Sequence, residues 1–235
     1  MPDNSRSSNP RWVLANQVAD AVLERHPDEV LAIGVHGSLA HGDDTEYSDV
    51  DIVVVTFGPG TGPRPATRRI GRVVVDLGVI TADEYLRHAR TLSTSWPLAA
   101  DQYLNTGLLY DPRSWFERLR DTHLARLAEA GHGEFVILAR EAWCQADAAL
   151  AKATRLASAY DMDAAMLVAG QSRLSAALVD GLLARTYFRN GADAVTRSGV
   201  AGMNLMELAD KLAAQAEELD RRGRPVHGCV DDLFL

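Results

Sequence analysis

Two aspartates stand at the start of a valine-rich run, DVDIVVV, at residues 49–55. In a β-strand, side chains at positions i and i+2 point the same way, about 6.6 Å apart along the chain, so Asp49 and Asp51 should share one face. The valine and isoleucine side chains between them would fill the opposite face. Neighbouring carboxylates repel each other and resist burial unless a cation lies between them. Their oxygens suit Mg²⁺, so the pair predicts a magnesium site.

A third acid, Asp76, interrupts another apolar run, VVVDLGVI at residues 73–80. A carboxylate in such a setting is costly unless it joins the same metal site, and three acids on two strands favour a two-metal centre. Upstream, Gly37-Ser38 closes an earlier apolar run. A strand that ends in this way and turns into a helix offers backbone N–H groups and a hydroxyl to a phosphate. A phosphate cradle beside metal-binding carboxylates indicates nucleotide chemistry.

The elements that must position these residues form a small α/β region followed by a helical one. Apolar side chains repeat at helical spacing over residues 12–24, and short β-type runs occupy residues 30–35, 49–55 and 72–80. The Gly- and Pro-rich segment 57–65 is expected to form a loop or a wide hairpin turn. Helix starts are indicated by the Thr81–Glu84 capping box and by Asp111-Pro112. The later pattern predicts helices at residues 112–130, 133–159, 162–188 and 204–221.

The composition is that of a globular protein with an acidic balance. The chain has 235 residues and a formal net charge of −8, which argues against a nucleic acid as main partner and suits a cationic one. No apolar stretch reaches the length of a membrane span, and residues 1–12 lack the apolar core of a signal peptide, so no membrane partner is expected. Cys144 and Cys229 fit neither a disulfide framework nor a thiolate metal site, which favours a reducing cytoplasm.

The order of the motifs resembles a known superfamily. Gly37-Ser38 followed by Ser48-Asp49-Val50-Asp51 is similar to the GS-x(n)-D-x-D signature of the DNA polymerase β-like nucleotidyltransferases. Within that superfamily the chain most resembles the kanamycin, or aminoglycoside, nucleotidyltransferases, through AIGVHGSL, YSDVDI, Asp76, SWPL and YD, and more weakly through the helical half. The resemblance implies an α+β fold. It consists of a nucleotidyltransferase domain with a mixed sheet at residues 1–110 and a C-terminal helical bundle for substrate binding and dimerisation at residues 111–235.

The resemblance also implies a reaction. Enzymes of this family hold a nucleoside triphosphate with Mg²⁺, and a hydroxyl of the aminoglycoside attacks the α-phosphorus. Nucleoside monophosphate is transferred, with ATP as the expected donor, and pyrophosphate leaves. By position in the motifs, the metal ligands are Asp49, Asp51 and Asp76. The nucleotide-binding residues are Gly37, Ser38, His41, Ser48 and Lys152, and His41 stands where the family often has arginine.

The general base of the relatives is a glutamate on a long helix of the second domain, with a lysine one turn later. Here that helix reads FVILAREAWCQADAALAKATRL, and aligning Lys152 with the family lysine places Ala148 at the base position. Glu141 lies on the same helical face about two turns earlier, whereas Asp147 is next to the expected position but rotated by about 100°. A register slip of a few residues would align Glu141 directly with a family glutamate. Glu141 is therefore the favoured base and Asp147 the alternative.

Two other functions stay open. The chain could be an antitoxin-like or regulatory protein of the nucleotidyltransferase fold that modifies or binds a partner protein, or a nucleotide-binding relative that has lost catalysis. Antitoxin-like and regulatory modules are usually shorter and lack a dedicated helical domain, so the long helical part favours a small-molecule acceptor. In the relatives one subunit of a homodimer supplies the metal ligands and the other the base, which implies a homodimer here.

Overall fold

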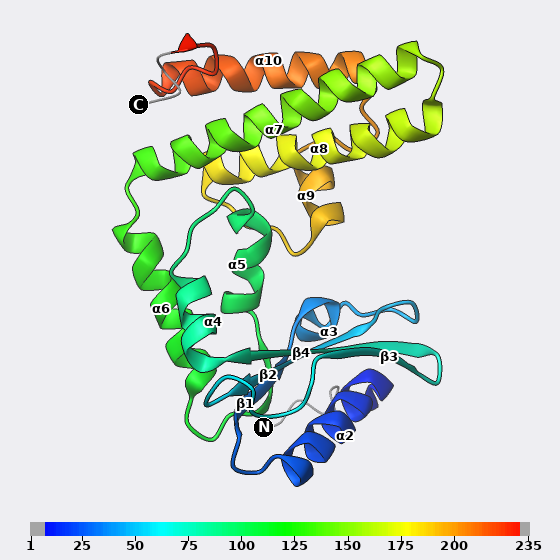
Figure 1. Cartoon of the computed structure of the whole chain (residues 1–235), viewed down its shortest axis with the longest axis vertical. Helices are drawn as coiled ribbons and strands as arrows, with labels where there is room; N and C mark the ends of the chain where they lie inside the picture. Colours follow the sequence, from blue (N-terminus) through cyan, green and yellow to red (C-terminus); the bar gives the residue numbers. More distant parts are fainter. Residues whose placement is uncertain (1–7, 231–235) are drawn as a thin grey trace. The chain divides into compact units, whose positions relative to one another are not determined.

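The computed structural model describes residues 8–230 and confirms the α+β fold (Figure 1). The chain forms two compact units. The first contains the residues up to Thr91 together with Asp101–Ala128, and the second contains Leu92–Ala100 and the residues from Glu129 onward. The functional division at residues 1–110 and 111–235 stays a prediction, because compactness does not show which residues bind the nucleotide or the acceptor.

A five-stranded sheet in the order β3-β4-β2-β1-β5 is the centre of the first unit. Its strands are β1 (Val30–Val35), β2 (Val50–Thr56), β3 (Ala66–Ile70), β4 (Val73–Thr81) and β5 (Gly107–Tyr110). β2 and β4 pair in parallel and the other pairs are antiparallel. The mixed sheet that the resemblance implied is therefore confirmed.

The segment between β2 and β4 is more elaborate than the sequence pattern indicated. Residues 57–65 lead into β3, which forms a hairpin with β4 across Gly71, a glycine with a φ of +62°. β3 has the sequence ATRRI and lies at an exposed edge of the sheet, so it lacks the apolar side chains by which a strand is recognised. This extra strand lets β4 return parallel to β2 instead of pairing with it as an antiparallel neighbour.

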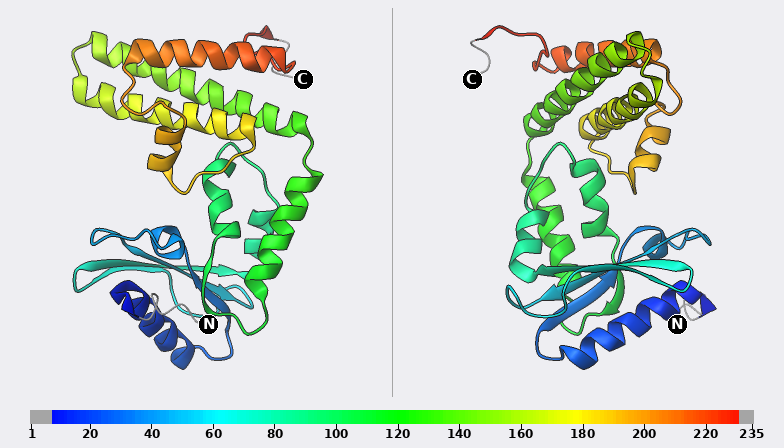
Figure 2. Two further views of the ribbon diagram at one scale, coloured as in Figure 1. Left: turned by 180° about the vertical axis from the view of Figure 1, so that it is seen from behind. Right: turned by 45° about the vertical axis from the view of Figure 1, so that its right-hand side comes forward.

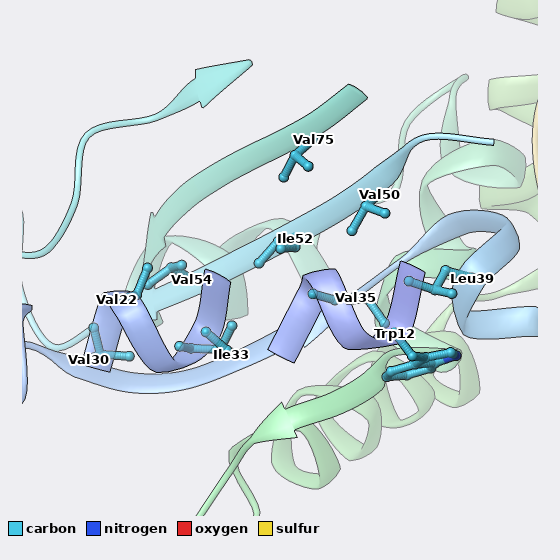
Figure 3. Packing of buried hydrophobic residues seen from close by; sticks show 12 residues of the cluster. Trp12, Val22, Val30, Ile33, Val35, Leu39, Val50, Ile52, Val54 and Val75 are labelled. Carbon is cyan, nitrogen blue, oxygen red and sulfur yellow. The ribbon is translucent and has the colours of Figure 1, made fainter. Parts of the chain in front are cut away.

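Helix α2 (Pro10–Arg25) covers one face of the sheet (Figure 3). Asn9 caps the helix by accepting a hydrogen bond of 2.8 Å from the Arg11 N–H. The buried side chains that join the helix to the sheet include Trp12, Ala15, Ala19, Val22, Ile33, Val35, Val50, Ile52, Val54 and Val75. Because Val50 and Ile52 face this core, Asp51 points to the opposite face.

The first unit also contains the helices α3 (Gly37–His41), α4 (Ala82–Ala89) and α6 (Trp115–Glu129), while α5 (Trp96–Leu104) spans the junction of the two residue sets. Thr81 accepts a hydrogen bond of 3.2 Å from the Glu84 N–H, as the capping box predicted. Asp111 accepts hydrogen bonds of 2.7 and 3.0 Å from the N–H groups of Trp115 and Phe116. Helix α6 therefore begins at Trp115 and not directly after Asp111.

The described part of the second unit contains the helices α7 (His132–Ser158), α8 (Met162–Ala184), α9 (Gly191–Arg197) and α10 (Leu205–Arg221). Figures 1 and 2 both show α7, α8 and α10 running alongside one another. The Ser172 hydroxyl donates to the Ala146 carbonyl at 2.7 Å, and the Trp143 indole N–H donates to the Leu212 carbonyl at 2.8 Å. Between residues 8 and 230, no helix combines the length and apolar character that crossing a membrane would require.

Candidate active site

Two of the three acids are brought together by the parallel pairing of β2 and β4. Asp51 and Asp76 are partners in the register of that pair, and adjacent strands lie about 4.8 Å apart. Asp49 precedes β2 by one residue and lies two positions before Asp51. The fold therefore places Asp51 and Asp76 on the sheet face that does not contact α2, with Asp49 just before the strand.

The charges of these carboxylates act on one another. Burial raises the pKa of Asp51 to about 6, and the charges of Asp49 and Asp76 add to this effect. Asp51 is half-buried, whereas Asp49 and Asp76 are exposed. The ionised form of Asp51 is thus disfavoured in the protein alone, and a cation between the carboxylates would relieve the repulsion.

The donor chemistry of these residues fits Mg²⁺, which prefers carboxylate oxygens. No three His, Cys, Asp or Glu side chains within residues 8–230 already form a metal-binding cluster. Mg²⁺ does not need one, because it keeps several waters and usually binds one or two carboxylates together with substrate phosphates. The assignment of Asp49, Asp51 and Asp76 as its ligands stays a prediction.

The Gly37-Ser38 turn lies directly against Asp51. The His36 N–H donates a hydrogen bond of 3.0 Å to the Asp51 carbonyl, and Gly37 has a φ of +65°. A Cβ atom at Gly37 would lie 2.9 Å from Oδ2 of Asp51, closer than such atoms normally approach. Only glycine can therefore occupy this position without displacing the carboxylate or straining the backbone.

His41 ends helix α3 and is held by a buried carboxylate. Its Nε2 atom lies 3.0 Å from both carboxylate oxygens of Asp101, and the Asn105 side-chain amide donates to Asp101 at 2.8 Å. Asp101 is 5% exposed, so this interaction is shielded from water. The nucleotide-binding role of His41 stays a prediction.

His36 lies at the other end of the same turn. Its Nε2 is 3.1 Å from the Tyr85 hydroxyl, and Nδ1 is buried with no hydrogen-bond partner among residues 8–230. Burial lowers the pKa of His36 to about 4, against the opposing effect of the Asp101 charge. The ring is therefore neutral at physiological pH and supports the turn without adding charge.

The loop that leads to Asp49 is fixed by residues that the motifs did not single out. The Arg11 Nε–H donates to the Ser48 carbonyl at 2.9 Å, and the Asn9 side-chain amide donates to both oxygens of Asp44 at 3.1 and 3.0 Å. The Ser48 hydroxyl accepts a hydrogen bond of 2.9 Å from the Thr45 N–H, which closes the turn before the strand. The role of Ser48 in nucleotide binding stays a prediction. Its position is set by the first turn of α2, some forty residues upstream, which no local pattern reveals.

The candidate base residues belong to the second unit. Glu141, Asp147 and Lys152 all lie on α7 and are exposed. The buried face of α7 is formed by other side chains, among them Ala139, Ala142, Trp143, Ala146 and Leu150. The three candidates therefore do not take part in the packing of α7. Their catalytic and nucleotide-binding roles stay predictions.

Comparisons with known proteins agree with the geometry of the first unit. Residues 15–92 match the family model described as a nucleotidyltransferase domain. Over 122 residues, or 52% of the chain, the sequence is 25% identical to the aminoglycoside nucleotidyltransferase (4') of Staphylococcus aureus and, separately, to that of a Bacillus species. Because the match covers 48% of each relative, the chain spans about half the length of the curated relatives it matches.

A solved structure, a nucleotidyltransferase-like protein from Exiguobacterium sibiricum 255-15, aligns with 88% of this chain and 75% of its own at 12% identity and a TM-score of 0.46. The family model and the curated relatives confirm the predicted resemblance to the aminoglycoside nucleotidyltransferases and their superfamily.

Proposed function

We propose that this protein transfers a nucleoside monophosphate to a hydroxyl of an aminoglycoside, since its residues 15–92 match the family model of a nucleotidyltransferase domain. ATP is the proposed donor, Mg²⁺ the metal, and pyrophosphate the second product. The observation that carries the proposal is the pairing of Asp51 with Asp76 beside the Gly37 turn, which brings paired carboxylates next to a glycine turn with backbone N–H groups. Because the reaction consumes a nucleoside triphosphate, we propose that the protein acts in the cytoplasm.

The residues of the first unit bind and orient the nucleotide in the proposed reaction. Asp49, Asp51 and Asp76 hold the metal, and the backbone N–H groups of Gly37 and Ser38 face the triphosphate. When bound, Mg²⁺ neutralises charge on the phosphate oxygens and aligns the attacking and leaving oxygens. The acceptor oxygen forms a bond to the α-phosphorus while the bond from that phosphorus to the bridging oxygen of pyrophosphate breaks. Binding both reactants in this orientation supplies much of the rate enhancement.

The exposed face of α7 supplies the proton acceptor in the proposed reaction. Glu141 takes the proton of the attacking hydroxyl, with Asp147 as the alternative, and Lys152 binds the phosphates. Glu141 and Lys152 lie on one exposed stripe of α7, as a base and a phosphate ligand serving one reaction should. We propose a homodimer in which the metal ligands and the base come from different subunits, as the resemblance implies.

The acceptor is proposed to be cationic because the chain carries a net charge of −8 and its candidate site is rich in carboxylates. Aminoglycosides are cationic, and the names of the curated relatives give aminoglycosides as their substrates. An acidic protein raises the local concentration of a cationic substrate and speeds its association at low ionic strength.

The deciding experiment is a pyrophosphate-release assay with ATP, Mg²⁺ and a panel of aminoglycosides, lincosamides and proteins. Turnover of an aminoglycoside that is lost in the Asp51→Asn variant would support the proposal. Turnover of a protein acceptor alone would favour a regulatory role. Binding of ATP without turnover of any acceptor would identify a nucleotide-binding relative that has lost catalysis.

A further inference from the structure

A line of three polar side chains crosses the sheet near one edge. In the antiparallel β3–β4 pair Thr67 is opposite Asp76, and in the parallel β2–β4 pair Asp76 is opposite Asp51. Register partners lie on the same face of a sheet and about 5 Å apart. Thr67, Asp76 and Asp51 therefore lie in a row on the face away from α2.

The Thr67 hydroxyl is engaged with Asp76 although water is available to both. Its Oγ1 donates a hydrogen bond of 2.5 Å to Oδ1 of Asp76, and both residues are exposed. A carboxylate has about four acceptor positions, so this single bond orients the group and leaves Oδ2 free for another partner. Threonine is β-branched and stiff at χ1, so the orientation is held at little further loss of side-chain freedom.

The strand itself does not depend on this hydrogen bond. β3 pairs with β4 through its backbone from Ala66 to Ile70, and Thr67 is exposed and outside the core. A β-branched residue without the hydroxyl would have a similar preference for the strand. The hydroxyl therefore orients the Asp76 carboxylate and is not needed for the pairing of β3 with β4.

We propose that Thr67 is a positioning residue that acts through Asp76. It holds the Asp76 carboxylate beside Asp51 so that both present oxygens to one Mg²⁺. This inference rests on the magnesium site of the proposed function. Carboxylates that bind metals are themselves hydrogen-bonded, and the loss of such a partner typically lowers metal affinity by about 10–100-fold.

The test measures Mn²⁺ binding in wild type, Thr67→Val and Thr67→Ser. Mn²⁺ is titrated by electron paramagnetic resonance into the protein without nucleotide, and a protein-free titration gives the background. We expect Thr67→Val to raise the Kd of Mn²⁺ about 10–100-fold, and Thr67→Ser, which retains the hydroxyl, to restore most of the affinity. Thr122→Val is the matched control, because it removes an exposed hydroxyl that donates to the Arg118 carbonyl on α6, and should leave the Kd unchanged.

Thermal melting of each variant shows whether the edge strand is retained, and Thr67→Ala provides a second variant without the hydroxyl. A Thr67→Val protein that melts like the wild type and binds Mn²⁺ with an unchanged Kd would overturn the role of Thr67 alone. If the wild type and Asp51→Asn bind Mn²⁺ equally weakly, the magnesium site of the proposed function fails, and this inference fails with it.

Discussion

The ionised form of Asp51 is disfavoured in the candidate site. Burial raises its pKa to about 6, and the charges of two neighbouring carboxylates add to this effect. A carboxyl whose folded pKa lies above its unfolded value binds its proton more tightly in the folded state. Its contribution to stability is therefore present below the ordinary pKa of an aspartate and is lost as the pH rises through about 6. The protein without metal should become less stable over this window on account of Asp51.

Replacing Asp51 removes this cost. We expect Asp51→Asn to abolish nucleotidyl transfer and to raise the Tm of the metal-free protein at pH 7 by up to about 2–4 °C, the shift for about 1 kcal/mol in a domain of this size, after discounting for the solvent exposure of the group. The gain should vanish near pH 4, since Asp51 is then protonated in the wild type. Melting curves between pH 4 and pH 8 check this, and Asp20→Asn, an exposed acid on α2, is the control. A gain of the same size at every pH would contradict the electrostatic explanation.

The buried carboxylate of Asp101 depends on His41 for a partner. His41→Ala removes the histidine from a buried carboxylate that keeps its hydrogen bond from Asn105. The substitution should destabilise the protein by about 1–3 kcal/mol. His88→Ala is the control, because His88 is exposed and lies 3.9 Å from Glu84, and it should change stability by less than about 0.5 kcal/mol. Urea unfolding measures both. Equal, small effects would show that the pair does not anchor α3.

At the scale of elements, the turn between β1 and α3 combines an unusual backbone with a close approach. Gly37 begins the short helix α3 and Gly42 follows its last residue, and both have positive φ, at +65° and +72°. A Cβ at Gly37 would lie 2.9 Å from Asp51 Oδ2, whereas a Cβ at Gly42 would meet nothing within 4 Å. The two glycines thus separate the cost of backbone strain from the cost of crowding the carboxylate.

Alanine at each glycine tests this distinction. Gly42→Ala should cost about 1 kcal/mol from the left-handed backbone alone. Gly37→Ala should cost more, up to about 3 kcal/mol, and should also lower the rate of transfer, because the carboxylate must move. Urea unfolding and pyrophosphate release give the two readouts. If both variants lose stability equally and keep full activity, the turn does not constrain Asp51.

At the scale of the whole molecule, the proposed reaction depends on residues from two compact units, with the metal ligands on the sheet and the base on α7. A positioned general base typically contributes about 10²–10⁴-fold to the rate. Glu141→Gln should therefore lower kcat by about that factor while the KM for ATP stays nearly constant. Asp147→Asn should have little effect, and Lys152→Ala should raise the KM for ATP. If Asp147→Asn loses activity and Glu141→Gln keeps it, Asp147 is the general base and Glu141 is not.

A site shared between two subunits can be tested by mixing inactive variants. If one subunit supplies Asp51 and its partner supplies Glu141, mixing the inactive Asp51→Asn and Glu141→Gln proteins should restore activity, because exchange of subunits creates one intact site per heterodimer. Light scattering should report a dimer. A fully active monomer, or a mixture that stays inactive after subunit exchange is shown, would contradict a shared site.

The sequence alone determined the features that depend on local spacing. Alternation placed Asp51 on the face opposite Val50 and Ile52, although β2 begins at Val50 and so leaves Asp49 just before the strand. The helical repeats located α2, α7, α8 and α10, and the order of the motifs identified the nucleotidyltransferase resemblance. It missed β3, because an exposed, arginine-rich edge strand carries no apolar pattern, and it placed the start of α6 too early because the Asp111 carboxylate caps a later turn. These features follow from solvent exposure and side-chain geometry, which a periodic pattern does not encode.

Contacts between residues far apart in the sequence appear only in the folded chain. The register that pairs Asp76 with Asp51 on one side and Thr67 on the other depends on an extra strand that makes β2 and β4 parallel. The contact of His41 with Asp101 joins residues 60 positions apart, and Arg11 reaches Ser48 across 37. Such contacts form because burial of the apolar face on α2 fixes the sheet, and the polar face then brings together whichever side chains the register places there. Residue types could therefore indicate nucleotide chemistry, but the neighbours that hold those residues in place appear only when the chain is folded.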